Sequence, residues 1–364
     1  MKTARIMDQP EDYEKLHINP DHIEMWEDGR RNHDDSSGNW EWWYFDSILD
    51  DGSKAVIQFF TKAGMKNIQK DGDVPSVTIK YTLPDGTLLQ DEVLPDLNEC
   101  SFGTDKCNVH LGSCSFVGDF KTYSIQVKGK KLGCDLTLVS HAKPYRPGTA
   151  YFEFGDDEYY TWLCSVPQGE VTGTLTYEGK TVEVHGSGYH DHQWGNRFYL
   201  PEWNNWLWAR QSFSDYSALI FDFVTSEESG FARIPVFFVQ NADGELVFES
   251  YDSVTCTVPE MTPVDKASGK EYPKIVCYEF DDGNAHVSYR LESKEILESQ
   301  GFKSKPVIGK IIVKKLGMNL SYMRFLGDGS MTLTKDGETL QRSGELIYEF
   351  MYPGDNCREH MVNA

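Results

Sequence analysis

The sequence predicts an all-β protein, a sandwich or a barrel, built from two copies of one β-unit. Short runs rich in β-branched and aromatic residues recur at close spacing, as in residues 55–60, 76–81 and 123–127. Turn sequences separate these runs, for example the Pro-Asp-Gly of residues 84–86, and few stretches show a helical period. Short strands punctuated by such turns are typical of antiparallel sandwiches and barrels.

The elements follow in order from this pattern. Residues 1–38 are polar and acidic and contain turn sequences, so we expect them to form an N-terminal arm. From Trp40 onward the β-rich pattern takes over, and residues 293–300 are the stretch that we expect to form one short helix. Because 364 residues exceed the usual size of one hydrophobic core, we expect two domains.

An internal repeat sets the boundary between these domains. Residues 174–182 are similar to residues 332–340. The two segments have six identities at one constant offset when Gly186 and Gly344, which follow them, are counted. A weaker match at a similar offset relates Trp42, Tyr44, Asp51, Ser53 and Phe59 to Trp206, Trp208, Asp215, Ser217 and Phe223. We therefore predict β-units at residues 39–195 and 196–352 and a tail at residues 353–364.

The densest group of chemically active side chains lies in residues 186–195, which read Gly-Ser-Gly-Tyr-His-Asp-His-Gln-Trp-Gly. A strand sends successive side chains to opposite faces, so Tyr189, Asp191 and Gln193 are expected on one face. His190, His192 and Trp194 are then expected on the other face, and in a closed barrel one of these two sets lines the interior. An aspartate that faces an aromatic interior is a candidate acid with a raised pKa. By the repeat, Asp191 corresponds to Glu349 in the second unit, which has no comparable cluster and is expected to be a scaffold.

Composition limits the partners and the compartment. The formal net charge is −22, from 57 acidic and 35 basic residues, which argues against nucleic acid and anionic membrane surfaces as partners. The eight cysteines form no C-x-x-C pair. We find neither a signal-peptide pattern nor an apolar run of about eighteen residues, so we predict no membrane span and a cytoplasmic location.

The candidate site residues also have purely structural interpretations. A buried aspartate between two histidines is often a hydrogen-bond hub, and Trp42 with Trp43 could fill a barrel core. His190 and His192 could bind a metal, but no third ligand is visible in the sequence, so no metal site is predicted. Dinucleotide-binding, phosphate-loop and serine-hydrolase motifs are absent, and we therefore expect no cofactor.

Three segments together resemble a known superfamily: Trp40 to Asp46, Tyr159 to Trp162 and Gly188 to Gly195. They are similar to the lipocalin-like hydratases and cyclases, which include carotenoid 1,2-hydratases, kievitone hydratases and fungal decalin-forming Diels-Alderases. The resemblance covers nearly the whole chain and implies two tandem lipocalin-like antiparallel β-barrels. It implies an acid at Asp191, with Tyr189 before it and Tyr160 and Trp162 facing the same cavity. Carotenoid hydratases tend to have a histidine near the position of Tyr160, so the resemblance does not transfer a substrate.

The residues and the resemblance lead to one functional prediction with two alternatives. Hydration of an alkene needs a strong proton donor, and aromatic faces stabilise the cation that forms. We predict a cofactor-free hydratase (hydro-lyase) that acts on an unsaturated hydrophobic small molecule. The alternatives are an isomerase, cyclase or pericyclase that folds a polyene, and a carrier that only binds such a ligand. The predicted catalytic residues are Asp191, Tyr189, His190 and His192, and the predicted substrate-binding residues are Trp42, Tyr44, Tyr160, Trp162, Trp194 and Trp208.

Overall fold

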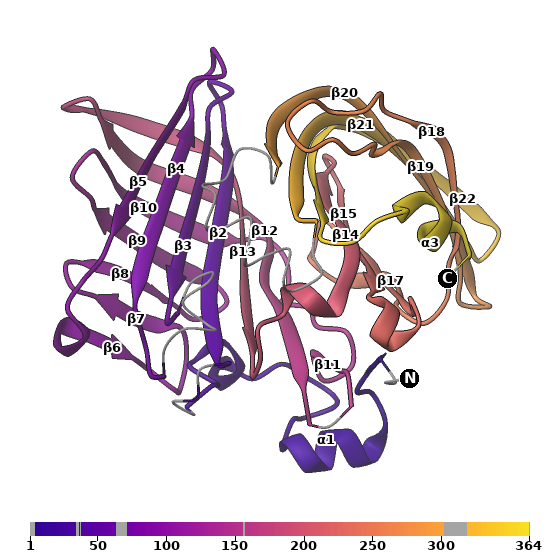
Figure 1. Ribbon diagram of the computed structural model, residues 1–364, viewed down its shortest axis with the longest axis horizontal. Helices are drawn as coiled ribbons and strands as arrows, with labels where there is room; N and C mark the ends of the chain where they lie inside the picture. The colour runs from indigo at the N-terminus through magenta and orange to yellow at the C-terminus, as the bar shows by residue number, and fades with distance from the viewer. Residues whose placement is uncertain are drawn as a thin grey trace. The chain divides into compact units, whose positions relative to one another are not determined.

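The computed structural model describes residues 4–33, 36, 38–62, 71–155, 157–301 and 319–363. The chain divides into two compact units, Ile6–Phe198 and a second that contains Tyr199–Ala364. Each unit is a strongly curled antiparallel sheet that forms a half-barrel around its own core (Figure 1). The predicted fold class, tandem lipocalin-like β-domains, is confirmed.

The sheet of the first unit runs in the order β5-β4-β3-β2-β13-β12-β10-β9-β8-β7-β6, so strands next to each other in sequence mostly pair. The long strands β12 and β13 form a hairpin at its centre, and β13 pairs on its other side with β2. The strands are β2 Trp40–Leu49, β3 Lys54–Phe60, β4 Ser76–Thr82, β5 Leu88–Val93, β6 Cys100–Phe102, β7 Asn108–Leu111, β8 Cys114–Gly118, β9 Thr122–Lys128, β10 Leu132–Ser140, β12 Tyr159–Tyr177 and β13 Lys180–Gly195. Two short strands, β1 Arg5–Ile6 and β11 Tyr151–Glu153, pair with each other, and β11 also pairs with β12.

The segment before β2 is folded onto the first unit and brings acidic side chains into its interior. Helix α1 spans Pro10–Leu16 and begins with a proline in its first turn, where a missing N–H costs nothing. The 3₁₀ helix η1 spans Met25–Asp28 and places Glu27 and Asp28 in buried positions. Another 3₁₀ turn, η3, spans Leu97–Glu99. No helix of the described residues is long and apolar enough to cross a membrane.

The sheet of the second unit runs in the order β17-β16-β15-β14-β22-β21-β20-β19-β18. Its strands are β14 Trp203–Ser212, β15 Tyr216–Thr225, β16 Arg233–Asn241, β17 Leu246–Ser250, β18 Thr255–Met261, β19 Pro273–Asp281, β20 Ala285–Gly301, β21 Ser321–Lys335 and β22 Glu338–Tyr352. The 3₁₀ turns η4 Leu200–Glu202 and η5 Glu227–Ser229 and the helix α3 Cys357–Asn363 complete the unit.

The helix predicted at residues 293–300 is wrong. These residues continue strand β20, with pairs to β21 that run from Ser293–Gly327 to Gln300–Tyr322 and two register shifts between them. Their glutamate, lysine and leucine side chains favour a helix in isolation, but pairing with the long strand β21 outweighs that local preference.

The internal repeat corresponds to two equivalent hairpins, β12–β13 and β21–β22. The turn residues Glu178 and Gly179 have φ angles of 51° and 74°, and Asp336 and Gly337 have 53° and 80°. Positive φ at both central residues is the signature of a type I′ turn, which matches the twist of the flanking strands. The repeated motif is therefore a pair of tight hairpin turns at the same place in each sheet.

Gly337→Ala should destabilise the second unit by about 1–2 kcal/mol, because an L side chain is strained in the left-handed region. Space is not the cause, since nothing lies within 4 Å of the position that a Cβ would take. Gly344→Ala in the same hairpin is the control: its Cβ would meet only Gln211 Nε2, at 3.6 Å, an ordinary contact. Urea unfolding curves of the two variants test this, and equal losses of stability would contradict it.

Candidate functional site

The site is built around β13, whose side chains separate into the two predicted sets. His190 lies beside Phe45 of β2, and His192 lies beside Trp43; both of these β2 residues belong to the core of the first unit. Asp191 lies opposite Tyr44, and its side chain is on the face of the sheet turned away from that core. The set that lines the barrel interior is therefore the histidine set.

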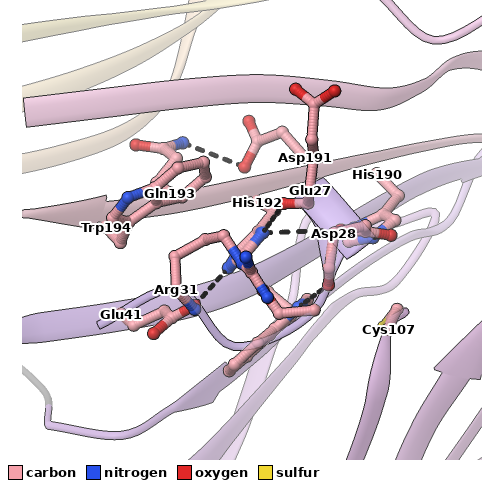
Figure 2. A network of polar contacts seen from close by, with 12 residues as sticks. Glu27, Asp28, Arg31, Glu41, Cys107, His190, Asp191, His192, Gln193 and Trp194 are labelled. Carbon is pink, nitrogen blue, oxygen red and sulfur yellow. Dashed lines mark hydrogen bonds and ion pairs between the residues drawn. The ribbon is translucent and has the colours of Figure 1, made fainter. Parts of the chain in front are cut away.

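The Asp191 carboxylate is buried, and three neutral groups donate hydrogen bonds to it. Gln193 Nε2 donates to Oδ1 at 2.9 Å, and Figure 2 shows this contact. Tyr189 OH and Trp162 Nε1 donate to Oδ2 at 2.8 and 3.2 Å. Tyr160 OH donates in turn to Gln193 Oε1, which orients the amide so that its NH₂ group faces Asp191.

The environment of Asp191 raises its pKa to about 6. Burial is the main cause, because it disfavours the charged carboxylate. Hydrogen bonds from Gln193, Tyr189 and Trp162 and the charge of His190 act in the opposite direction and limit the rise. The corresponding acid of the second unit, Glu349, has a charged partner, because Arg324 Nε donates a hydrogen bond to Glu349 Oε1 at 3.0 Å.

Four of the six predicted substrate-binding residues share this face with Asp191. Trp42 and Trp162 lie on either side of Gln193 in the strand register, and Tyr44 lies opposite Asp191. The rings of Trp42 and Trp40 stack with centroids 4.4 Å apart, and Tyr160 lies 5.6 Å from Trp40. Asp191 and its aromatic neighbours thus form one continuous cluster on β2, β13 and β12.

The structure places the two histidines away from this cluster, among acidic groups on the core side. His192 Nε2 lies 2.7 Å from Glu41 Oε1, and its Nδ1 lies 3.2 Å from the backbone oxygen of Glu27. Its ring stacks on that of Trp43 at 4.6 Å. Figure 2 shows His192 and Glu41 joined in this way. The four predicted catalytic residues therefore divide between the two faces of β13. Only Tyr189 lies beside Asp191, while His190 and His192 lie on the other face.

The two remaining predicted substrate-binding residues are Trp194 and Trp208. Trp194 is on the histidine face, where its Nε1 donates to Tyr151 OH at 3.2 Å and its ring lies 4.7 Å from that of His192. Trp208 belongs to strand β14 of the second unit and pairs with Glu349 in the register of that sheet.

Two acidic residues that were not among the predicted site residues, Glu27 and Glu41, complete the histidine face. Glu41 accepts hydrogen bonds from the backbone N–H groups of Arg31 and Asn32 at 2.8 and 3.0 Å. Glu27 is paired with Arg146 at 2.8 Å, and both side chains are buried. Successive side chains of β2 point to opposite faces, and Glu41 is two positions before Trp43. It therefore lies on the same face as Trp43 and the histidines. The alternation was therefore a usable signal for Glu41, whereas Glu27 precedes the strand and carries no such signal.

Charge and burial oppose each other at these acids. Burial raises the pKa of Glu27 above its usual value, although the charge of Arg146 opposes the rise. Burial alone would also raise the pKa of Asp28, but the charge of His190 and a hydrogen bond from it, together with His192 and Tyr123, lower that pKa overall. Asp28 is thus an ionised carboxylate inside the first unit.

Comparison with known proteins assigns the chain to a family. The profile of the AttH-like family matches residues 28–295, which is more than half of the chain. The chain belongs to the AttH-like family. The AttH protein of Nitrosomonas europaea shares its fold with a TM-score of 0.60 and 15% identity, over 92% of this chain and 98% of that one.

Other relatives of this AttH-like protein include enzymes. The structure of CghA matches with a TM-score of 0.59 and 13% identity over 93% of this chain and 97% of that one. Kievitone hydratase of Nectria haematococca matches with a TM-score of 0.53 and 13% identity, over 92% and 94% of the two chains. In sequence, the quinolone epoxide rearrangement protein penF of Penicillium thymicola is 26% identical over 199 residues, which are 50% of this chain and 55% of that protein. The chain thus spans about half the length of that curated relative.

In this AttH-like protein, Tyr189→Phe should lower the free energy of unfolding by about 1–2 kcal/mol, because it removes a buried hydrogen bond to a carboxylate. The control is Tyr177→Phe on the adjoining strand β12, where the side chain is half-buried, and its effect should stay below about 0.5 kcal/mol. Urea unfolding followed by tryptophan fluorescence measures both. Equal values for the two variants would show that the hydrogen bond of Tyr189 to Asp191 adds no stability beyond that of a half-buried hydroxyl.

Proposed function

We propose that this protein is an enzyme that adds water to, or removes it from, an unsaturated hydrophobic small molecule, with Asp191 as the proton donor. The observation that carries the proposal is geometric. A buried carboxyl group lies within a cluster of indole and phenol rings, and none of its three hydrogen-bond donors carries a charge. Such surroundings raise the fraction of the neutral carboxylic acid, the form that can deliver its proton.

The reaction balances with groups of the chain and water alone. Asp191 transfers a proton to one alkene carbon, and the electron pair of the double bond forms the new C–H bond. A carbocation remains at the other carbon, where the faces of rings such as Trp42 and Trp162 can stabilise it, each contact contributing about 2 kcal/mol when water is excluded. Water then attacks that carbon, and its surplus proton returns to the Asp191 carboxylate. Dehydration is the same sequence in reverse.

The neighbours of Asp191 have separable roles in this scheme. Tyr189 and Gln193 fix the orientation of the carboxyl group, because each holds a different oxygen at hydrogen-bond distance. Tyr160 holds Gln193 and so acts through it. The histidine pair lies on the other face and is assigned no contact with substrate.

The names of the relatives support a chemical reaction on a small molecule without fixing which reaction it is. One structural relative is a hydratase by name, and the sequence relative penF is an epoxide rearrangement protein. CghA has also been solved with the small molecule Sch210972. The match to penF favours a second candidate, a rearrangement or cyclisation in which the acid protonates oxygen or carbon and no water enters the product.

Mass spectrometry with heavy-oxygen water distinguishes these reactions. The purified protein would be incubated in H₂¹⁸O with a set of unsaturated isoprenoids, polyketides and phenolics. A product that has gained one labelled water is the expected result. A product of unchanged mass and altered retention would replace hydration with the rearrangement or cyclisation. Ligands that bind and return unaltered would show a carrier and overturn the proposal of an enzyme.

A further inference from the structure

Three metal-ligating side chains from distant parts of the chain meet inside the first unit. They are Asp28 of η1, Cys107 just before β7, and His190 of β13, and one ligand atom from each lies within 4.8 Å of the others. All three residues are buried. Neither the spacing of the cysteines nor that of the histidines shows this meeting, because it depends on the closure of the sheet.

His190 contacts the backbone with one ring nitrogen and Asp28 with the other. Its Nδ1 lies 2.8 Å from the backbone oxygen of Tyr44, so Nδ1 must carry the proton that it donates. Its Nε2 lies 3.3 Å from Asp28 Oδ2. Donation from one nitrogen to a backbone carbonyl, with the other nitrogen presented to a ligand, is the usual arrangement of a metal-binding histidine.

The Asp28 carboxylate has one oxygen with a firm partner and one without. Tyr123 OH donates to Oδ2 at 2.6 Å. Oδ1 accepts no hydrogen bond from the described residues, and His192 Nδ1 lies 3.6 Å from it. Asp28 is 2% exposed, and an unsatisfied oxygen of a buried carboxylate is costly. A cation bound to this carboxylate would offset that cost.

We propose that Asp28, Cys107 and His190 bind a zinc ion. Sulfur, imidazole nitrogen and carboxylate oxygen are the three ligand types that Zn²⁺ accepts, and water would complete a tetrahedral set. Coordination requires the Cys107 thiolate and a deprotonated His190 Nε2, so it releases to solvent both the thiol proton and the proton that Nε2 donates to Asp28. The ion would fasten η1 and the start of β7 to β13. The inference stands apart from the proposed function, since the three residues lie on the core side of β13 and Asp191 on the other.

Metal analysis of the whole chain tests the site without any assay of activity. The protein would be produced with zinc supplied, passed through a chelating resin to remove loosely held ions, and measured by elemental mass spectrometry. About one zinc per chain is expected. Replacement with Co²⁺ should give a near-ultraviolet thiolate-to-cobalt charge-transfer band, which only a cysteine ligand produces.

Substitutions locate the ion. Cys107→Ser should abolish the cobalt band and lower the zinc content to a small fraction of the wild type, and Asp28→Asn and His190→Gln should also lower the zinc content. Cys134→Ser removes another buried thiol of the same unit and should keep both signals. A wild-type chain that folds, holds no zinc and shows no cobalt band would overturn the proposal and leave His190 and Asp28 as an ion pair. Full zinc binding by Cys107→Ser would equally overturn it by placing the ion elsewhere.

Discussion

Asp191→Asn is expected to lower turnover by about 10²–10⁴-fold, the usual contribution of a general acid or base. The asparagine keeps the size of the side chain and one acceptor oxygen but has no proton to give to an alkene. Binding of the hydrophobic ligand should change little, because the rings of the cluster are untouched. Steady-state kinetics on the substrate found in labelled water, together with a direct measurement of ligand affinity, gives both quantities.

The stability of this variant decides how a loss of activity is interpreted. The buried Asp191 carboxylate costs free energy, as its raised pKa indicates, and the substitution removes that charge. The asparagine also cannot accept all three hydrogen bonds, since its nitrogen donates. The two effects oppose each other, so we expect the free energy of unfolding to stay within about 1 kcal/mol of the wild type.

Glu349→Gln is the matched control for the chemical step. Glu349 occupies the equivalent position in the second unit, on strand β22, but its carboxylate is paired with the guanidinium group of Arg324. We expect this variant to keep the wild-type turnover. Full activity of Asp191→Asn would show that Asp191 is not the acid, and equal losses in both variants would point to a general effect on folding.

Local patterns were sufficient to predict the fold class and the two faces of β13. Alternation along one strand separates Asp191 from His190 and His192, and the contacts of each follow that separation. The repeat of residues 174–182 at residues 332–340 corresponds to two equivalent hairpins, because the positive φ at Gly179 and Gly337 imposes a strong local requirement on sequence. Features set by a few adjacent residues could therefore be predicted.

Features that depend on closure of the sheet could not be predicted from the sequence. Alternation alone does not say which face of a strand is concave, so it left open which set lines the barrel interior. Asp28 is separated from His190 by 162 positions and lies in a segment with no β pattern, so nothing local marks it as a partner. The helix predicted at residues 293–300 failed for the same reason, because a long partner strand decided the conformation there.

Glu41→Gln should be the most destabilising of the single changes considered in the first unit, at about 3 kcal/mol or more. Three N–H groups converge on this fully buried carboxylate: those of Arg31 and Asn32 and His192 Nε2. Glutamine has almost the same shape, but its NH₂ group replaces one acceptor oxygen, so at least one donor would face another donor. The change also removes the carboxylate that lies 2.7 Å from His192 Nε2.

A solvent-exposed pair of a glutamate and a histidine in the same unit tests whether burial causes the large loss of stability expected for Glu41→Gln. Glu170 Oε1 lies 2.9 Å from His185 Nε2, and these side chains are 44% and 55% exposed. Because water screens such a pair, Glu170→Gln should cost less than about 1 kcal/mol. Urea unfolding of both variants at neutral pH makes the comparison. Equal losses of unfolding free energy for Glu41→Gln and Glu170→Gln would show that the buried acids do not hold the histidine face of β13. The position of Asp191 on the other face of that strand would then depend on its aromatic neighbours alone.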